Sequence, residues 1–257
     1  FITRNEGIFR SEGGGLSLSI SYFFIATYYQ TFLILTYHFV YRLKVLTRGR
    51  SMFDGWSLTN WIQLCIAINV LYIGAFMFSC WYAFGADDYS RSLDPTLLIK
   101  WYDVDTSDPD VGYMIVTYKR PNVDSGEMEW HGRVLIGMAV VASLFLGTGA
   151  VILICIALIS KSINSADLST KTKKMQQQLF RALLIQTGVP CVFSYLPLAT
   201  ILLFPLTGID LGALGTPLIM TTAIFPSVDA LFVIFFIPRF RSAIYRAIRL
   251  NARENST

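Results

Sequence analysis

Five apolar blocks, each long enough to cross a lipid bilayer, constrain this chain more than any other feature of its sequence. A bilayer core about 30 Å thick needs roughly 20 apolar residues in helical form, because backbone polar groups find no water there. The blocks predict membrane spans at 16–40, 58–82, 134–159, 179–204 and 213–237. The predicted fold class is therefore an all-α membrane protein, a transmembrane helix bundle with five visible spans.

The composition supports a membrane protein over a soluble one. Hydrophobic residues make up 54% of the 257 residues and charged residues only 15%, whereas soluble domains carry about 25% charged residues. The net charge of +4 is unevenly spread and does not indicate nucleic-acid binding. We expect no nucleic-acid partner, and the lipid bilayer is the first partner that the sequence implies.

The basic residues predict the orientation of the spans. The connections 41–57 and 160–178 and the tail 239–257 together hold 13 Lys and Arg residues against three acids. The connection 83–133 instead holds ten acids against five basic residues. Because positive charge is retained on the cytoplasmic side, we expect 83–133 to be an extracellular loop, 239–257 a cytoplasmic tail, and the N-terminal end to lie outside the cell.

The long acidic loop contains a segment with the composition of a strand. Residues 111–118 are rich in strand formers, and turn signals follow at 119–122 and 124–126. This pattern indicates a short hairpin or a lid over the bundle. A solvated acidic spacer is the alternative interpretation.

Prolines mark two candidate hinges within the spans. Pro190 and Pro197 interrupt the fourth block, and Pro226 precedes Asp229 by three residues in the last one. A proline removes a backbone donor and loosens a helix, and an acid at membrane depth usually faces a bundle interior or a cavity. The functional interpretation is a kinked span that swings and a polar hinge at Asp229. The alternatives are a static kink and a structural acid bonded to neighbouring hydroxyls.

Polar and aromatic clusters at the ends of the spans are further candidates. His38, Tyr41 and Arg42 end the first span at its predicted cytoplasmic face, where Arg42 either pairs with groups on neighbouring helices or reaches to the interface. Aromatic residues crowd the outer ends of the first two spans and indicate either an apolar ligand pocket or an interfacial belt with core packing. The candidate pocket residues are Tyr22, Tyr28, Tyr29, Phe32, Trp81 and Tyr82.

Signatures of enzyme chemistry are missing from the sequence. It has no Gly-rich phosphate loop and no cysteine pair at metal-ligand spacing. Its two histidines, His38 and His131, fall on opposite predicted sides of the membrane. We therefore expect neither an enzyme nor a bound cofactor or metal. A channel or carrier would need several ionisable groups at mid-membrane, and Asp229 is the one that the sequence provides.

Three motifs together resemble the Str-type serpentine chemoreceptors of nematodes. They are YHFVYR at 37–42, QQQLFRALLIQTGVP at 176–190, and FPSVDALFVIFFIP at 225–238 with RFRSAIYR directly after it. The resemblance implies a seven-helix receptor in which the five visible spans are helices 3–7. Two further spans would precede Phe1, so the chain is expected to be N-terminally truncated. Residue 41 is Tyr where an acid would stand in rhodopsin-type receptors, so the ionic lock of those receptors is not expected.

The resemblance also implies a function. The chain is expected to be a G-protein-coupled chemosensory receptor of the olfactory type, in the plasma membrane as a multi-pass protein, in a sensory cilium. A small odorant-like ligand would bind among the outer halves of the helices. The kinked span 179–204 would then swing outward and open an inner crevice to a heterotrimeric G protein. The residues expected to bound that crevice are Arg42, Lys173, Lys174 and Arg181. A membrane channel or carrier is the alternative.

Overall fold

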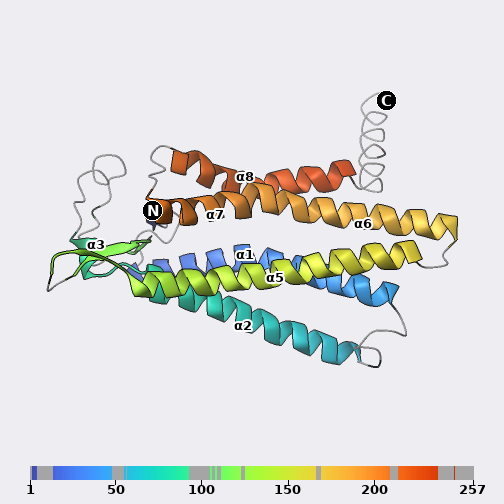
Figure 1. The fold of residues 1–257 in the computed structure, drawn as a ribbon, viewed down its shortest axis with the longest axis horizontal. Coiled ribbons are helices and arrows are strands. Elements are labelled where there is room, and N and C mark those ends of the chain that lie inside the picture. The colour runs from blue at the N-terminus through green and yellow to red at the C-terminus, as the bar shows by residue number, and fades with distance from the viewer. Residues whose placement is uncertain are drawn as a thin grey trace, which may run out of the picture. The chain divides into compact units, whose positions relative to one another are not determined.

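The computed structural model is built almost entirely from long helices (Figure 1). Four short strands are gathered at one end of the three long helices in the N-terminal part of the chain. It describes residues 2–4, 14–47, 55, 57–92, 105, 108, 111–122, 125–165, 169–208, 214–236 and 246. The side chains at 14, 17, 226, 229, 230 and 232–236 lie outside this description. The chain divides into two compact units, 1–159 and 160–257, which are described separately below.

Unit 1 contains the helices α1 (Gly14–Leu46), α2 (Leu58–Phe84) and α5 (Gly132–Ser165), the last of which continues into unit 2. Each helix buries one stripe at helical spacing, because residues three or four apart share a face. On α1 the stripe is Tyr22, Ala26, Tyr29, Leu33 and Thr36, and on α5 it includes Val134, Val141, Ile152 and Ile159. The core of unit 1 lies between these stripes.

Helices α2 and α5 approach each other closely at Gly137. A Cβ atom placed on this glycine would lie 2.2 Å from the Cβ of Ala83 on α2. Two small residues therefore set the separation of the helices, as is common where membrane helices pack backbone against backbone. This contact lies near the end of α2 that leads into the strands.

The strands form a cap at that end of unit 1. Strand β1 (Ile2–Arg4) pairs antiparallel with β2 (Tyr113–Ile115), and Gly85 at the end of α2 forms a bridge with Met114. Strands β3 (Lys119–Pro121) and β4 (Met128–Trp130) form a hairpin. We call residues 2–4, 85–92, 111–122 and 125–131 the cap, and the neighbouring ends of the helices the cap end.

The cap contains a hairpin, as the sequence predicted, but its first strand at 119–121 is a segment that the sequence assigned to a turn. The hairpin is built by β3 and β4, with a turn at Gly126, whose φ of +70° suits a residue without a side chain. The strand-forming segment at 113–115 pairs instead with the strand at 2–4, far away in the chain. Its residues are buried, with Tyr113 fully so.

Unit 2 consists of one long interrupted helix packed on a second helix. Helix α6 (Thr170–Pro190) runs into the π-helical turn η2 (Cys191–Tyr195), then α7 (Leu196–Leu203) and a 3₁₀ turn η3 (Phe204–Thr207) that ends at Gly208. Helix α8 (Gly215–Phe236) contacts α6, η2 and α7. The interruption follows Pro190 directly and lies before Pro197.

The π-turn has a physical cause in these two prolines. Each lacks an N–H group, and each ring crowds the preceding turn of helix. The amide of Leu196 accordingly bonds the carbonyl of Cys191, five residues back rather than four. A wider turn of this kind inserts one residue into an α-helix and bends it.

Four helical segments are long and apolar enough to cross a membrane: 18–46, 58–84, 132–165 and 170–207. They contain the second, third and fourth predicted spans in full and the first from residue 18 on. Helix α8 covers nearly all of the fifth, although a five-span count stays a prediction. Only 22–33% of the most apolar window of each segment is buried within the protein. The large exposed apolar surface, which includes Leu71, Leu146 and Leu153, is the surface that lipid would cover.

Candidate functional site

The clearest candidate site is a cluster of aromatic rings between α1, α2 and α5 below the cap. The ring of Tyr29 stacks on Phe76 at a centroid distance of 5.6 Å and meets Phe145 edge-on at 5.4 Å. Phe76 also meets Phe145 edge-on at 6.1 Å, and Phe32 lies 6.3 Å from Phe145. Tyr72 joins the cluster through Phe76. These arrangements are the ones that aromatic quadrupoles favour.

The structure separates the six predicted pocket residues into three groups. Tyr28, Tyr29 and Phe32 belong to or border the cluster, with the Tyr28 ring edge-on to Tyr29. Tyr22 is buried nearer the cap, with its hydroxyl beside Gly85. Trp81 is 63% exposed, and Tyr82 stacks on Phe78. For Trp81 the geometry therefore matches the interfacial interpretation rather than the pocket.

Sequence reasoning missed three members of the cluster: Tyr72, Phe76 and Phe145. Tyr72 and Phe76 stand four residues apart, on the face of α2 that also carries Ser79, Cys80 and Ala83. That spacing was a usable signal for the two α2 residues. Phe145 offered none, because the apolar residues of 134–159 surround the helix on every side.

A polar contact joins α1 and α2 beside the aromatic cluster, because Asn69 precedes Tyr72 by three residues and Gln30 directly follows Tyr29. The amide of Asn69 donates to the hydroxyl of Tyr37 (3.0 Å) and to the carbonyl of Cys65 (2.7 Å), and it accepts a hydrogen bond from Gln30. These groups satisfy one another across the helix pair. Asn69 therefore acts as an interhelical hydrogen-bonding residue rather than as part of an open polar path.

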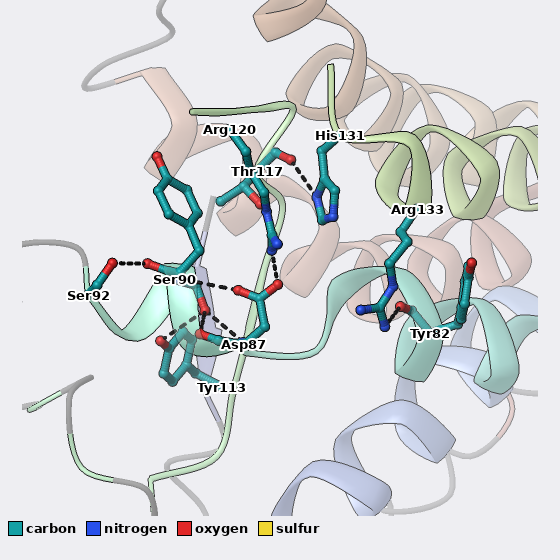
Figure 2. A network of polar contacts seen from close by, with 10 residues as sticks. Tyr82, Asp87, Ser90, Ser92, Tyr113, Thr117, Arg120, His131 and Arg133 are labelled. Carbon is teal, nitrogen blue, oxygen red and sulfur yellow. Dashed lines mark hydrogen bonds and ion pairs between the residues drawn. The ribbon is translucent and has the colours of Figure 1, made fainter. Parts of the chain in front are cut away.

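The cap contains a network of polar contacts centred on Asp87 (Figure 2). The carboxylate of Asp87 caps the short helix α3 (Asp88–Arg91) by accepting from the amide of Ser90 at 3.0 Å, and the Ser90 hydroxyl accepts from the amide of Asp87 at 2.8 Å. The same carboxylate forms an ion pair with Arg120 of the hairpin. The Arg120 guanidinium also lies over the ring of Tyr89, 5.3 Å from its centroid. One acid thus ties the start of the loop to the hairpin.

The end of the hairpin is fixed to the start of α5 by His131. Its amide donates to the carbonyl of Tyr118 at 2.8 Å, and its Nδ1 lies 3.2 Å from the carbonyl of Thr117. The next turn adds Arg133, whose guanidinium donates to the carbonyl of Tyr82 at 2.9 Å and lies over its ring. Hairpin, α5 and α2 are therefore held together at the cap end (Figure 2).

Burial and neighbouring charges shift three pKa values in the cap. Burial lowers the pKa of His131, and the positive charges of Arg120 and Arg133 lower it further against the opposing bond to Thr117. Burial also lowers the pKa of Arg120, with a contribution from Arg133. Burial raises the pKa of Tyr118 to about 12. The cap is thus arranged for a neutral imidazole beside two guanidinium groups.

The predicted switch residues lie in both units. In α1, His38 is exposed, Tyr41 is 70% exposed and Arg42 is half-buried. Two residues further on, the Lys44 ammonium lies 4.5 Å from the centroid of the Trp61 ring on α2. In α6, Lys173 is half-buried, whereas Lys174 and Arg181 are exposed. The assembly of these residues around one crevice stays a prediction.

The predicted hinge in 179–204 coincides with the π-turn η2. Pro190 ends α6 immediately before it, and Pro197 lies in the first turn of α7 after it. Within the turn, the hydroxyl of Ser194 is buried and has no hydrogen-bond partner among the described residues. The second predicted hinge lies in α8, where the side chains of Pro226 and Asp229 fall outside the described residues. Its role stays a prediction.

No cluster of metal-ligating side chains occurs in the part of the chain that the structure describes. What the described residues offer is an aromatic core between helices, an ordered cap over it and an interrupted helix in the second unit. This arrangement provides apolar contacts and hydrogen-bonding groups, which are the means by which small-molecule sites bind.

Comparison with known proteins gives a consistent set of relatives. The family model for the serpentine type 7TM GPCR chemoreceptor Str matches residues 9–245. The chain is 24% identical to the G-protein coupled receptor str-33 of Caenorhabditis elegans over 80% of its own length and 59% of that protein. It is 24% identical to the serpentine receptor class r-10 of the same organism, over 88% of the chain and 65% of the relative.

A further relative is the serpentine receptor class J-38 of Caenorhabditis elegans, 28% identical over 83% of the chain and 63% of that protein. The chain therefore spans about three fifths of the length of the curated relatives that it matches. No solved structure matches the chain.

Proposed function

Because the chain belongs to the Str family of serpentine chemoreceptors, a family of the seven-transmembrane G-protein-coupled type, we propose that it is part of a chemosensory receptor. In this proposal a small ligand binds between the helices near the cap, which faces the outside of the cell. The bound receptor then signals to a heterotrimeric G protein. The observation that carries the proposal is the aromatic cluster of α1, α2 and α5 beneath an ordered cap.

The chemistry of the cluster favours a small, largely apolar ligand of the odorant type. The rings of Tyr29, Phe32, Phe76 and Phe145 offer apolar faces and edges, while the cap keeps its own polar groups bonded to one another. Such surroundings recognise shape and apolar area more than charge. A ligand would insert between rings that already touch, so binding requires a rearrangement of the cluster.

The interrupted helix supports the signalling half of the proposal. A ligand shifts a receptor only through different affinities for two conformations, and a conformational change needs an element that can bend. The π-turn between Pro190 and Pro197 is such an element in unit 2. In this proposal, bending there moves α6 with Lys173, Lys174 and Arg181 and opens a surface for the G protein.

The test is a functional assay on the full-length parent receptor in cells that carry a promiscuous G protein. A panel of small volatile compounds is applied, and calcium release and membrane current are both recorded. We expect a subset of compounds to trigger calcium release only when the G protein is present. Ligand-gated current in cells without the G protein would instead identify a channel and overturn the proposal.

Two variants locate the ligand in the same assay. Tyr29→Leu removes a ring from the centre of the cluster, and it should raise the ligand concentration needed for half-maximal response. Trp81→Leu is the matched control, because Trp81 is 63% exposed and lies outside the cluster. Equal responses from both variants, at equal surface expression, would contradict a ligand site in the cluster.

A further inference from the structure

The β3–β4 hairpin has two faces of different chemistry. Residues directly opposite each other in an antiparallel pair project to the same face, and successive residues alternate. The register places Lys119 opposite Trp130, Arg120 opposite Glu129, and Pro121 opposite Met128. One face therefore carries Lys119, Pro121, Met128 and Trp130, and we call it the hairpin's outer face.

The other face is anchored to α3 and to the residue that precedes it. Arg120 is half-buried, pairs with the carboxylate of Asp87 and lies over the ring of Tyr89. On the same side, the carboxylate of Glu129 accepts a hydrogen bond of 2.7 Å from the amide of Asn122. The contacts of Arg120 fix which way the hairpin points, so the outer face turns away from α3.

The outer face is exposed and mostly apolar. Met128 is 58% exposed and Trp130 is 52% exposed, while Lys119 and Pro121 are exposed beside them. The ammonium of Lys119 lies 4.8 Å from the centroid of the Trp130 ring. A large aromatic ring, a thioether and a cation thus stand together without a covering element in the described part of unit 1.

This face continues the surface of a membrane span. Trp130 lies two residues before Gly132, the first residue of α5, and the bonds of His131 to Tyr118 and Thr117 hold the junction. The contact of Arg133 with Tyr82 brings the ends of α5 and α2 to a common level. At that level α2 also exposes an aromatic residue, Trp81. Trp130 therefore stands where a membrane helix leaves the hydrocarbon.

We propose that the outer face of the hairpin rests on the phospholipid headgroup layer. Indole rings favour this layer because their apolar body enters the lipid boundary while the N–H stays hydrated. Met128 and Trp130 would enter the boundary, and Lys119 would extend to lipid phosphates, as long cationic side chains do at interfaces. The exposed apolar surface at Trp81 on α2 gives the hairpin continuity with the lipid-facing surface of the helices. The bilayer then serves as a support that fixes the position of the cap.

The test uses the full-length receptor in phosphatidylcholine nanodiscs that hold one receptor each. A spin label is placed at Met128→Cys and, as the matched control, at Glu127→Cys, an exposed neighbour that points to the other face. Collision rates are measured with oxygen, which concentrates in lipid, and with a water-soluble nickel complex. Signal from the native cysteines, which include four in this chain, is subtracted with the receptor that has no added cysteine.

We expect the label at residue 128 to collide with oxygen more often and with the nickel complex several-fold less often than the label at 127. A label at Trp130→Cys should behave like the one at 128, and it serves if Met128→Cys does not fold. Equal nickel accessibility at 127 and 128 would overturn the proposal. A second preparation holds two receptors in each disc. Protection of residue 128 from the nickel complex in that preparation alone would also overturn the proposal, since a second chain would then cover the face. None of these outcomes depends on signalling.

Discussion

The cap end of unit 1 and the interrupted helix of unit 2 are held by different kinds of interaction. At the cap end, side chains far apart in the sequence lock the helices: Asp87 pairs with Arg120, and Tyr29 packs on Phe76 and Phe145. In unit 2 the backbone hydrogen bonds of the helix change from α-helical to π-helical spacing at η2, and the buried hydroxyl of Ser194 has no partner among the described residues. Unit 1 is thus held by contacts between side chains, whereas the long helix of unit 2 contains a break in its backbone hydrogen-bond pattern.

The largest expected effect is the loss of a ring from the aromatic cluster. Phe76→Ala removes a side chain that is 3% exposed, and buried Phe→Ala changes reduce the free energy of unfolding by about 3–5 kcal/mol. The control is Phe78→Ala, two residues along the same helix and 59% exposed. Thermal unfolding of purified full-length receptor in detergent measures both. Similar losses for the two variants would mean that the cluster does not stabilise unit 1.

The contact between α2 and α5 should tolerate no added side chain. Gly137→Val places a branched side chain where even a Cβ atom would lie 2.2 Å from Ala83, and overpacking costs typically about 1–3 kcal/mol. Gly147→Val is the matched control on the same helix, because no atom lies within 4 Å of its added Cβ. The same unfolding measurement applies. An unchanged free energy of unfolding in Gly137→Val would show that α2 and α5 can move apart, as easily as unit 2 is proposed to bend.

Removal of Asp87, the acid at the centre of the polar network, should destabilise the strands of the cap. Asp87→Ala abolishes an N-cap, worth about 1 kcal/mol, and a half-exposed ion pair, worth up to about 1 kcal/mol more. Asp88→Ala is the control, because its side chain is exposed at the next position. Amide hydrogen exchange at 113–121 measures the change. Unchanged exchange in Asp87→Ala would show that the contacts of Asp87 do not stabilise the cap.

Acidification should destabilise the cap through His131. Its pKa is lowered in the folded protein, so the unfolded cap binds more protons as the pH falls below the ordinary histidine value near 6.5. The free energy of opening should therefore decrease from about pH 7.5 to about pH 5.5. Amide hydrogen exchange at 113–121 measures the free energy of opening of the cap. His131→Gln should remove its pH dependence. An increase in protection at low pH would contradict the sign.

The smallest effect is expected in the π-turn. Ser194→Ala removes a hydroxyl that has no partner among the described residues, so its unfolding free energy should change by less than about 0.5 kcal/mol or rise slightly. The control is Thr187→Val, which removes a hydroxyl bonded to the carbonyl of Leu183 at 2.9 Å, at a cost of about 0.5–1.5 kcal/mol. A larger loss for Ser194→Ala would show that unit 2 is locked by side chains as well.

Half of the candidate site was accessible from sequence, for reasons visible in single residues. Tyr29 and Phe32 were predicted because aromatic residues crowd one stretch of α1, and an interruption of the fourth span was predicted because Pro190 and Pro197 act on the backbone locally. The π-turn between them was not predicted, since an α-helix with a kink has the same proline pattern. Trp81 was placed among the pocket candidates because one stretch of sequence does not show which face of α2 meets α1.

The sequence by itself determined the long helices, the membrane as their surroundings and the chemoreceptor family. Burial in lipid depends on the length and composition of each block alone, and these are local quantities. The tertiary structure decided which residues meet: β1 with β2, Asp87 with Arg120, and Phe76 with Phe145. Such pairs join residues 33 to 113 positions apart, and neither partner carries a local signal of the other. Their contacts arise only when the helices pack and bring the ends of the loop together.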